Sequence, residues 1–430
     1  MEIKPFQVVH YPLARDVLER VVCPPYDKFT DALLTEFREK DANNFSHAIL
    51  GESLTDHHFY PNAASTLRGW VQEGVLHREE TEKFMVYRQT YESPFSGETM
   101  TRTGFYALLA LPERDQQEVL PHERTFEEHK ADRLRLYREV RGNPEGIFVL
   151  FSDPEGTVGS ELSGIPMKVT FTDYAGHTNQ LGLIDSDDAI KKIRSVVESQ
   201  KLLIADGHHR FETGQNFRDE CRAANPDAIG PQPYDYILVY LAALEDPGLQ
   251  ILPTHRLVKD IQAPEQSDFL KRASDLFEIE TIEGAVTPDA ISKAALDLNN
   301  SESDRETLGF VTKNKLTLLC LRDTEKLRSL LPPEVDACLR DLPVVWLHRV
   351  MFDQFLKVRE DQGAPDRIGF ARTGQDVFDG LNNGYQAAFL LRGTRPGEVK
   401  RVAESGVRMP QKSTDFYPKI LSGIAAYLYP

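Results

Sequence analysis

The sequence predicts a mixed α/β fold. Short apolar runs of strand length, such as residues 202–205 and 236–244, recur along the chain beside stretches with helical periodicity, such as residues 187–200. At residue 206 a strand pattern passes into a helix pattern through a single turn. With 430 residues, the chain is long enough for two or three domains, each with a core of its own.

The bulk composition limits the classes of function. The formal net charge is −17, whereas a protein that follows a nucleic-acid backbone usually carries a basic face, so we expect no nucleic-acid partner. The N-terminus lacks a signal-peptide pattern, and the longest apolar run is too short to cross a membrane, which predicts a cytoplasmic protein. The cysteines form no C-x-x-C pair, which fits a reducing compartment: Cys23, Cys221, Cys320 and Cys338. The oligomeric state stays open.

The N-terminal part begins with a strand and a proline-rich loop within residues 1–30. The segment Pro24-Pro25-Tyr26-Asp27 must be extended before its prolines, so it holds Tyr26 and Asp27 at fixed places. This loop is either part of a site or a rigid surface turn. Helices are expected at residues 31–40 and 62–73, and between them His57 and His58 are interpreted as a loop without a shared metal.

Paired strands at residues 84–90 and 103–111 precede a helix with an unusual inward face. Thr125 and Glu128 form a capping box at its start, and Gly142-Asn143-Pro144 ends it. Its apolar face also carries basic side chains: Phe126, His129, Lys130, Arg133, Tyr137 and Val140. Buried charges need partners, which are either a bound anion or protein carboxylates. His122 and Glu123, in the loop before this helix, are expected to reach a cleft.

The most informative stretch runs from Lys201 to Cys221, where the strand at residues 202–205 hands over to a helix. Asp206-Gly207 is a turn signal, and Gly207 allows a ligand to approach the backbone closely. Backbone N–H groups at a helix start favour an anion, and His208, His209 and Arg210 add donors for phosphate or carboxylate. The simpler interpretation is a solvated polar turn.

The rest of the chain contributes two further polar segments. Pro253-Thr254-His255-Arg256 follows a short strand, and Lys412, Ser413 and Thr414 lie in a loop that lacks the glycine of a Walker motif. These three loop residues either donate to an anion or belong to a surface loop. Between the two segments, residues 263–323 are expected to form a plainer module of helices and a hairpin.

The whole chain resembles family 1015 of domains of unknown function, whose members are often described as SpoOJ/ParA/ParB/RepB-like. The matching segments are Pro24–Asp27, Pro121–Thr125 with Lys130–Arg133, Ala205–Arg210, Pro253–Arg256 and Met409–Thr414. The Asp-Gly-His-His-Arg segment also resembles the phosphate-binding segment of the ParB/sulfiredoxin superfamily, which includes free-serine kinases. His208 stands where sulfiredoxins carry a catalytic cysteine, and no basic recognition helix of a partition protein is evident.

These resemblances imply a ParB/sulfiredoxin-like core at residues 151–262. An N-terminal module at 1–150, an insertion at 263–323 and a C-terminal module at 324–430 would surround it. The implied function is a nucleotide-dependent phosphotransferase that acts on a small metabolite and uses ATP or ADP with Mg. Two alternatives stay open: a non-catalytic nucleotide-binding regulatory protein, and a metal-dependent hydrolase that uses Asp206, His208, His209, His122 and His255.

The expected residue roles follow from the chemistry of phosphoryl transfer, which needs donors around the phosphates and a base at the acceptor. Catalytic candidates are Asp206, His208, His209 and Glu123. Phosphate-binding candidates are Gly207, His208, His209, Arg210, Lys412, Ser413 and Thr414. Substrate-binding candidates are Tyr26, Asp27, His122, Lys130, Arg133 and His255. We expect the Asp206 turn, the segment from His122 to Arg133 and the Lys412 loop to form one site.

Overall fold

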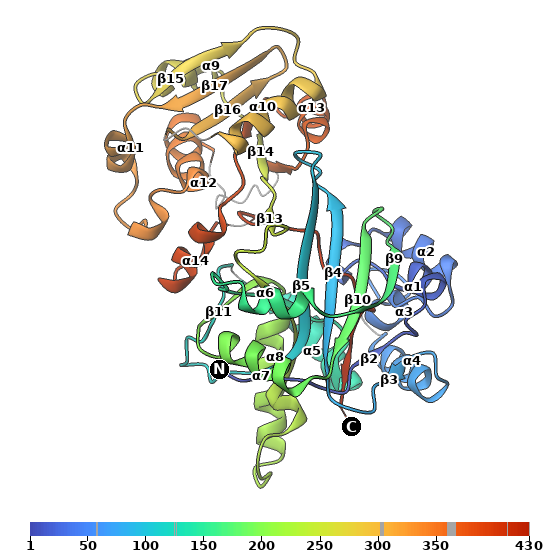
Figure 1. Ribbon diagram of the computed structural model, residues 1–430. Coiled ribbons are helices and arrows are strands. Elements are labelled where there is room, and N and C mark those ends of the chain that lie inside the picture. The colour runs from blue at the N-terminus through green and yellow to red at the C-terminus, as the bar shows by residue number, and fades with distance from the viewer. Residues whose placement is uncertain are drawn as a thin grey trace. The chain divides into compact units, whose positions relative to one another are not determined.

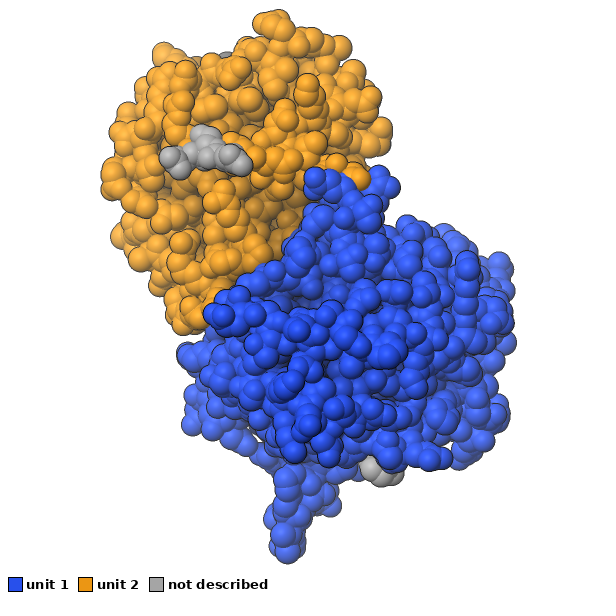
Figure 2. Space-filling view, in the orientation of Figure 1, with its two compact units in different colours: residues 1–93, 98–250, 418–430 blue, residues 94–97, 251–417 orange. Residues whose placement is uncertain are grey.

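The protein is described by a computed structural model that covers residues 1–56, 59–123, 125, 127–301, 305–358, 367–410 and 412–429. The expectations for His57, His58, Phe126 and the His129 side chain, and those for Arg124 and Gln411, lie outside this description. The chain divides into two compact units, shown in different colours in Figure 2. Unit 1 comprises residues 1–93, 98–250 and 418–430, and unit 2 comprises residues 94–97 and 251–417.

Unit 1 is built on a nine-stranded mixed sheet in the order β6-β11-β8-β12-β5-β4-β10-β9, with β1 paired to β5. Strands β5, β4, β10 and β9 run side by side as an antiparallel group (Figure 1), and β8 runs parallel to β12. The bounds are β1 Ile3–Lys4, β4 Phe84–Glu92, β5 Thr99–Ala110, β6 Val119–Leu120, β8 Ile147–Phe151, β9 Met167–Thr172, β10 Thr178–Ile184, β11 Leu202–Asp206 and β12 Tyr236–Ala243.

The two faces of this sheet differ in composition. One face carries a core of aliphatic and phenylalanine side chains, with Ile147, Val149 and Phe105 among its members, and helices α6 (Thr157–Ser163) and α7 (Asp187–Val197) contribute to that core. The Ser186 hydroxyl caps α7 by accepting from the Ala189 N–H, as expected for a helix that starts after a serine. On the other face, aromatic side chains of neighbouring strands meet, including Phe148, Tyr240 and Tyr106.

The remaining helices of unit 1 position the polar segments. Helix α5 packs against both α8 and α4. The C-terminal segment returns to this unit, where β21 pairs with β7, and Ser422 and Cys23 form an isolated antiparallel β-bridge through their backbones. The bounds are α1 Arg15–Val21, η1 Tyr26–Lys28, α2 Asp31–Lys40, α3 Ser46–Ile49, α4 Tyr60–Gln72, α5 Glu127–Val140, α8 His208–Ala224, η2 Pro233–Asp235, β2 Val9–His10, β3 His77–Arg78, β7 Gly142–Asn143 and β21 Tyr427–Leu428.

Unit 2 contains a six-stranded sheet in the order β15-β17-β16-β19-β14-β18. Helices α10 and α13 supply part of its core through Ile291, Leu298, Val377 and Leu381. The bounds are β14 His255–Val258, α9 Ala263–Ala273, β15 Phe277–Ile282, α10 Pro288–Asn300, β16 Thr307–Thr312, β17 Lys315–Leu321, α11 Thr324–Leu330, η3 Ala337–Leu339, α12 Pro343–Trp346, η4 Leu347–Leu356, β18 Ile368–Ala371, α13 Gly374–Asn382, β19 Ala387–Leu390, α14 Pro396–Glu404 and β20 Phe416–Tyr417, while β13 Gln250–Ile251 spans the boundary between the units.

The predicted mixed α/β class is confirmed. The expected strands at residues 84–90 and 103–111 are β4 and β5, and the expected helix at residues 187–200 is α7. The division into four modules at residues 150, 262 and 323 stays a prediction beside the two compact units. Within the described residues, no helix is both long enough and apolar enough to span a membrane.

Candidate functional site

The strand-to-helix turn lies where the sequence predicts it. Strand β11 ends at Asp206, Gly207 follows with a φ of +94°, and α8 begins at His208. A left-handed backbone conformation favours glycine, and a Cβ atom at this position would lie only 3.1 Å from Nε of Arg210. Gly207 therefore serves both the turn and the close approach of the Arg210 guanidinium, and it has no side chain with which to cap α8.

Arg210 places a buried guanidinium at this turn. Its side chain is 3% exposed, Nη1 donates to the Gly146 carbonyl at 2.6 Å, and Nη2 contacts Oδ2 of Asp206 at 3.2 Å. Among the described residues, Nε has no hydrogen-bond partner. Burial acts to lower the pKa of Arg210, but the carboxylates of Glu145 and Asp206 raise it by more than burial lowers it. The guanidinium is therefore permanently charged.

Asp206 is held as an anion by surrounding cations. Burial acts to raise the pKa of its carboxyl group, but Lys419 and Arg210 lower it more, and the net pKa is well below its ordinary value. Lys419 Nζ lies 3.4 Å from Oδ1 of Asp206. A carboxylate this acidic is a weak proton acceptor near pH 7, so its chemistry is that of a cation ligand or an electrostatic anchor.

His122 and His208 meet, which the sequence left open. The backbone N–H of His122 donates to Nε2 of His208 at 3.3 Å, and the two rings are T-shaped with centroids 4.6 Å apart. In a neutral ring this geometry leaves the proton of His208 on Nδ1, which lies 3.7 Å from Oε2 of Glu123. His208 thus fastens the His122–Glu123 segment to the start of α8.

The inward basic residues of α5 have protein carboxylates as partners. Lys130 contacts Glu127 at 2.6 Å and Glu212 at 3.0 Å. Arg133, which is 3% exposed, contacts the Asp132 carboxylate at 2.6 Å. Of the two alternatives that the sequence left open, these contacts match the carboxylate partners, and the inward placement of Lys130 and Arg133 requires no bound anion.

The proline-rich loop approaches the same region. The Arg133 guanidinium lies 4.3 Å from the centroid of the Tyr26 ring, and the Tyr26 N–H donates to Oε1 of Glu145 at 3.3 Å. Asp27 is exposed and contacts Lys28 at 3.4 Å. Tyr26 and Asp27 both raise the pKa of Arg210, after the larger effects of burial, Glu145 and Asp206, so this loop lies beside the turn.

Sequence reasoning missed Glu145 and Lys419. Glu145 is 4% exposed and accepts hydrogen bonds from the Ser422 hydroxyl and the Tyr26 N–H. Glu145 directly follows the helix-ending Gly142-Asn143-Pro144, and Lys419 follows Phe416-Tyr417-Pro418. A charged residue directly after a rigid turn was the available signal, but nothing local indicated that either residue would meet Arg210 or Asp206.

His209 is half-buried in the first turn of α8, in unit 1, whereas His255, Lys412, Ser413 and Thr414 belong to unit 2. His255 is fully buried, its Nδ1 accepts from the Leu391 N–H at 3.2 Å, and burial lowers its pKa to about 4. Lys412 Nζ lies 4.3 Å above the Phe370 ring, and its carbonyl accepts from Arg256 Nη2 at 3.1 Å. The segments around residues 255 and 412 therefore meet within unit 2. A ligand shared by Lys412, Ser413 and Thr414 with Asp206 stays a prediction.

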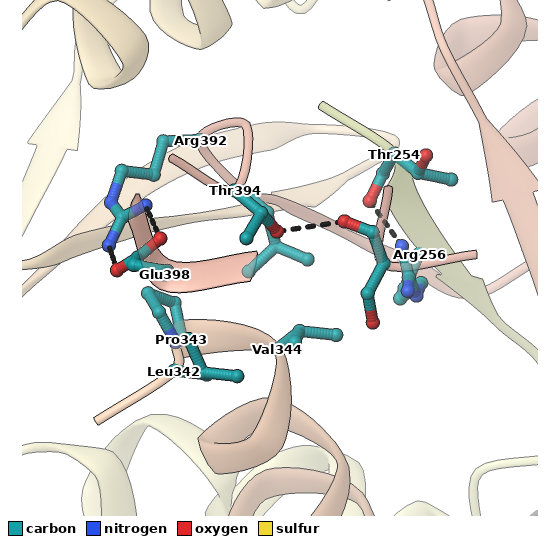
Figure 3. Close-up of a pocket in the computed structure, with 10 residues that line it drawn as sticks. Thr254, Arg256, Leu342, Pro343, Val344, Arg392, Thr394 and Glu398 are labelled. Atoms are coloured by element: carbon teal, nitrogen blue, oxygen red, sulfur yellow. Dashed lines mark hydrogen bonds and ion pairs between the residues drawn. The ribbon is translucent and has the colours of Figure 1, made fainter. Parts of the chain in front are cut away.

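A small cavity of about 20 Å³ lies beside these two segments of unit 2 (Figure 3). Thr254, Arg256 and Ser413 contribute to its lining. Arg392, also at this cavity, is paired with Glu398 at 2.7 Å and with Glu306 at 2.6 Å. The cavity has room for about one water molecule, so it does not define a metabolite site.

A mixed α/β protein with a buried, cation-rich turn at a helix start is the class that the fold and these contacts define. The chain belongs to the family described as "Protein of unknown function (DUF1015)", whose model matches residues 3–345. No curated protein matches.

Several solved structures are similar to this chain at low identity. A conserved hypothetical protein from Pyrococcus furiosus is 13% identical with a TM-score of 0.33, covering 73% of this chain and 92% of its own. A free serine kinase in complex with AMP is 11% identical with a TM-score of 0.32, covering 72% and 86%. SbnI with a C-terminal truncation, from Staphylococcus aureus, is 8% identical with a TM-score of 0.35, covering 74% and 85%.

Proposed function

We propose that unit 1 carries a phosphotransferase site in which the start of α8 binds the phosphates of ATP or ADP with Mg. The observation that carries this proposal is the Arg210 guanidinium, buried beside the glycine-capped helix start with an Nε that has no hydrogen-bond partner among the described residues. A helix start and an arginine together supply donors and positive potential for a phosphate. The acceptor is the alcohol group of a small metabolite.

The two carboxylates near the turn have different roles in the proposed reaction. Asp206, kept ionised by Lys419 and Arg210, is suited to contact the magnesium ion that accompanies a nucleotide. Glu123 is about one-third exposed and lies beside His208, so it is the candidate base for the acceptor hydroxyl, with His208 as a positioning residue. The resemblance of the Asp206–Arg210 segment to free-serine kinases favours a hydroxy-amino acid as acceptor, within a ParB/sulfiredoxin-like core.

Phosphorus NMR of the intact chain with ATP or ADP, magnesium and a pool of hydroxy-amino acids tests the activity. We expect a new phosphomonoester resonance together with conversion of the nucleotide. Nucleotide binding without turnover for any acceptor would instead support a non-catalytic regulatory protein. Absence of both binding and turnover would overturn the proposal.

A metal-dependent hydrolase is the second candidate, because His122, Glu123 and His208 are placed to share a cation. One ligand atom from each of the three lies within 4.8 Å of the others. Zinc bonds of about 2.0–2.2 Å would require these atoms to move closer together. For a phosphotransferase, we expect elemental analysis of untagged protein to find far less than one transition-metal ion per chain. One tightly held zinc that is lost in His122→Ala would favour the hydrolase.

We further propose that the protein acts in the cytoplasm on small molecules and not on nucleic acid. The net charge of −17 supports this, because a net negative charge disfavours association with the phosphate backbone.

A further inference from the structure

A second buried arginine lies on the aromatic face of the unit 1 sheet. Arg102 on β5 is the cross-strand partner of Gln89 on β4, and its guanidinium lies 4.5 Å from the ring centroid of Phe148 and 5.5 Å from that of Tyr240. Gln89 is fully buried as well. The strand predicted from the sequence at residues 103–111 starts one position after Arg102, so the sequence analysis did not identify this residue.

The donors of Arg102 are largely unsatisfied. The side chain is 0% exposed, and Nη2 donates to Oε1 of Gln89. Nε and Nη1, which carry three of the five N–H donors of a guanidinium, have no hydrogen-bond partner among the described residues. No described carboxylate lies within ion-pair distance of Arg102. The Asp246 carboxylate and the Tyr240 hydroxyl are still close enough for Arg102 to lower the pKa of each, after the larger effect of burial, which raises it. Contacts with two ring faces offset only part of the cost of burying a charge. A buried cation whose N–H donors lack acceptors is suited to bind an anionic group of a ligand.

Arg102 is connected to the α8 site through the sheet. Gln89 Nε2 donates to the Lys419 carbonyl at 3.2 Å, and Lys419 Nζ contacts Asp206. Phe148, which Arg102 covers, is the cross-strand partner of Asp206. In the sheet order β5-β12-β8-β11, the Arg102 guanidinium reaches across β12 to Phe148 on β8, the strand next to that of Asp206. This position fits a small molecule with an anionic group at each end.

We propose that Arg102 binds a second anionic group, carboxylate or phosphate, of the ligand whose first phosphate binds at the start of α8. The assignment of the first group rests on the proposed function, whereas the second rests on the burial and unsatisfied donors of Arg102. Arg102 would then select ligands with two anionic groups over ligands with one.

The test compares Arg102→Met with a matched control, Arg88→Met. Arg88 lies on β4 next to Gln89, and its guanidinium donates to the side chains of Thr103 and Gln180, at 3.3 and 3.4 Å. Calorimetry of the full chain uses inorganic phosphate, pyrophosphate and phosphoglycolate as probes. We expect Arg102→Met to weaken the binding of a two-anion probe about tenfold or more, as for the loss of one charged hydrogen bond, and to leave inorganic phosphate unchanged.

The probes also distinguish a carboxylate from a phosphate as the second anionic group. They further distinguish failure of the Arg102 proposal from failure of the proposed phosphate site at the start of α8. A loss confined to phosphoglycolate identifies a carboxylate, and a loss confined to pyrophosphate identifies a phosphate. Equal weakening of all probes, or none, together with a lower melting temperature, would make Arg102 a structural residue and overturn the proposal. If wild-type protein binds no probe, the proposed phosphate site at the start of α8 is wrong, and the proposed function fails with it. Arg102→Met without ligand is expected to keep or raise the melting temperature, because an unpaired buried charge is removed.

Discussion

Replacing Arg210 with alanine is expected to lower the free energy of unfolding by about 3–5 kcal/mol, the range for breaking a buried ion pair. The substitution leaves the Asp206 and Glu145 carboxylates without their shared cation, and it leaves the Gly146 carbonyl without its donor. Binding of ADP with magnesium should weaken as well, by about 1.5–3 kcal/mol for the lost charged hydrogen bonds. Urea unfolding and titration calorimetry measure the two effects separately.

Arg218 provides the matched control on the same helix. It is 1% exposed and donates to the carbonyls of Leu111 and Pro112, away from the start of α8. Arg218→Ala should therefore cost stability without changing nucleotide affinity. Arg210→Lys should keep the charge but recover only part of the affinity, because lysine lacks the planar guanidinium. An Arg210→Ala protein that is destabilised but binds ADP like wild type would limit Arg210 to a structural role.

Alanine substitutions at Arg210 and at Arg133 should both lower stability as well as activity. Both side chains are only 3% exposed and are paired with carboxylates, so their removal must also destabilise the fold.

Replacing Asp206 with asparagine is expected to change how stability depends on pH. The pKa of Asp206 is lowered in the folded protein, so its carboxylate contributes stability fully at pH values above the unfolded pKa of about 3.9. That contribution is lost as the pH falls from there toward the folded pKa. We expect wild type to exceed Asp206→Asn in unfolding free energy by roughly 2 kcal/mol at pH 7, and by progressively less in urea titrations below about pH 4.

An exposed carboxylate supplies the comparison for this experiment. Asp227 lies in the segment after α8, and Asp227→Asn should leave the pH profile close to that of wild type. A stability difference between wild type and Asp206→Asn that stays constant from pH 7 to below pH 4 would contradict the lowered pKa. In the phosphorus NMR assay, Asp206→Asn should also lose turnover if the carboxylate contacts magnesium.

Local sequence determined the elements that carry the candidate site. The apolar run at residues 202–205, the Asp206-Gly207 turn and the periodicity after it predict β11, its end and α8 to within a residue or two. The same reasoning assigns the faces of α5, since Arg133 and Tyr137 are buried and Glu127 and Glu128 are exposed. These features depend on period, caps and turn residues within a few positions of one another, so they can be predicted from the sequence.

Only the tertiary structure decided which charges meet. Asp206 and Lys419 are 213 positions apart, and His122 meets His208 across 86 positions. No local pattern indicates that the distant Glu145 stabilises the charge of Arg210, or that Arg102 is buried on the aromatic face of the sheet with Nε and Nη1 lacking acceptors among the described residues. Which distant residue meets a buried charge depends on strand order and register. Both are set by burial across the whole sheet, so the residues next to that charge in the sequence do not predict its partner.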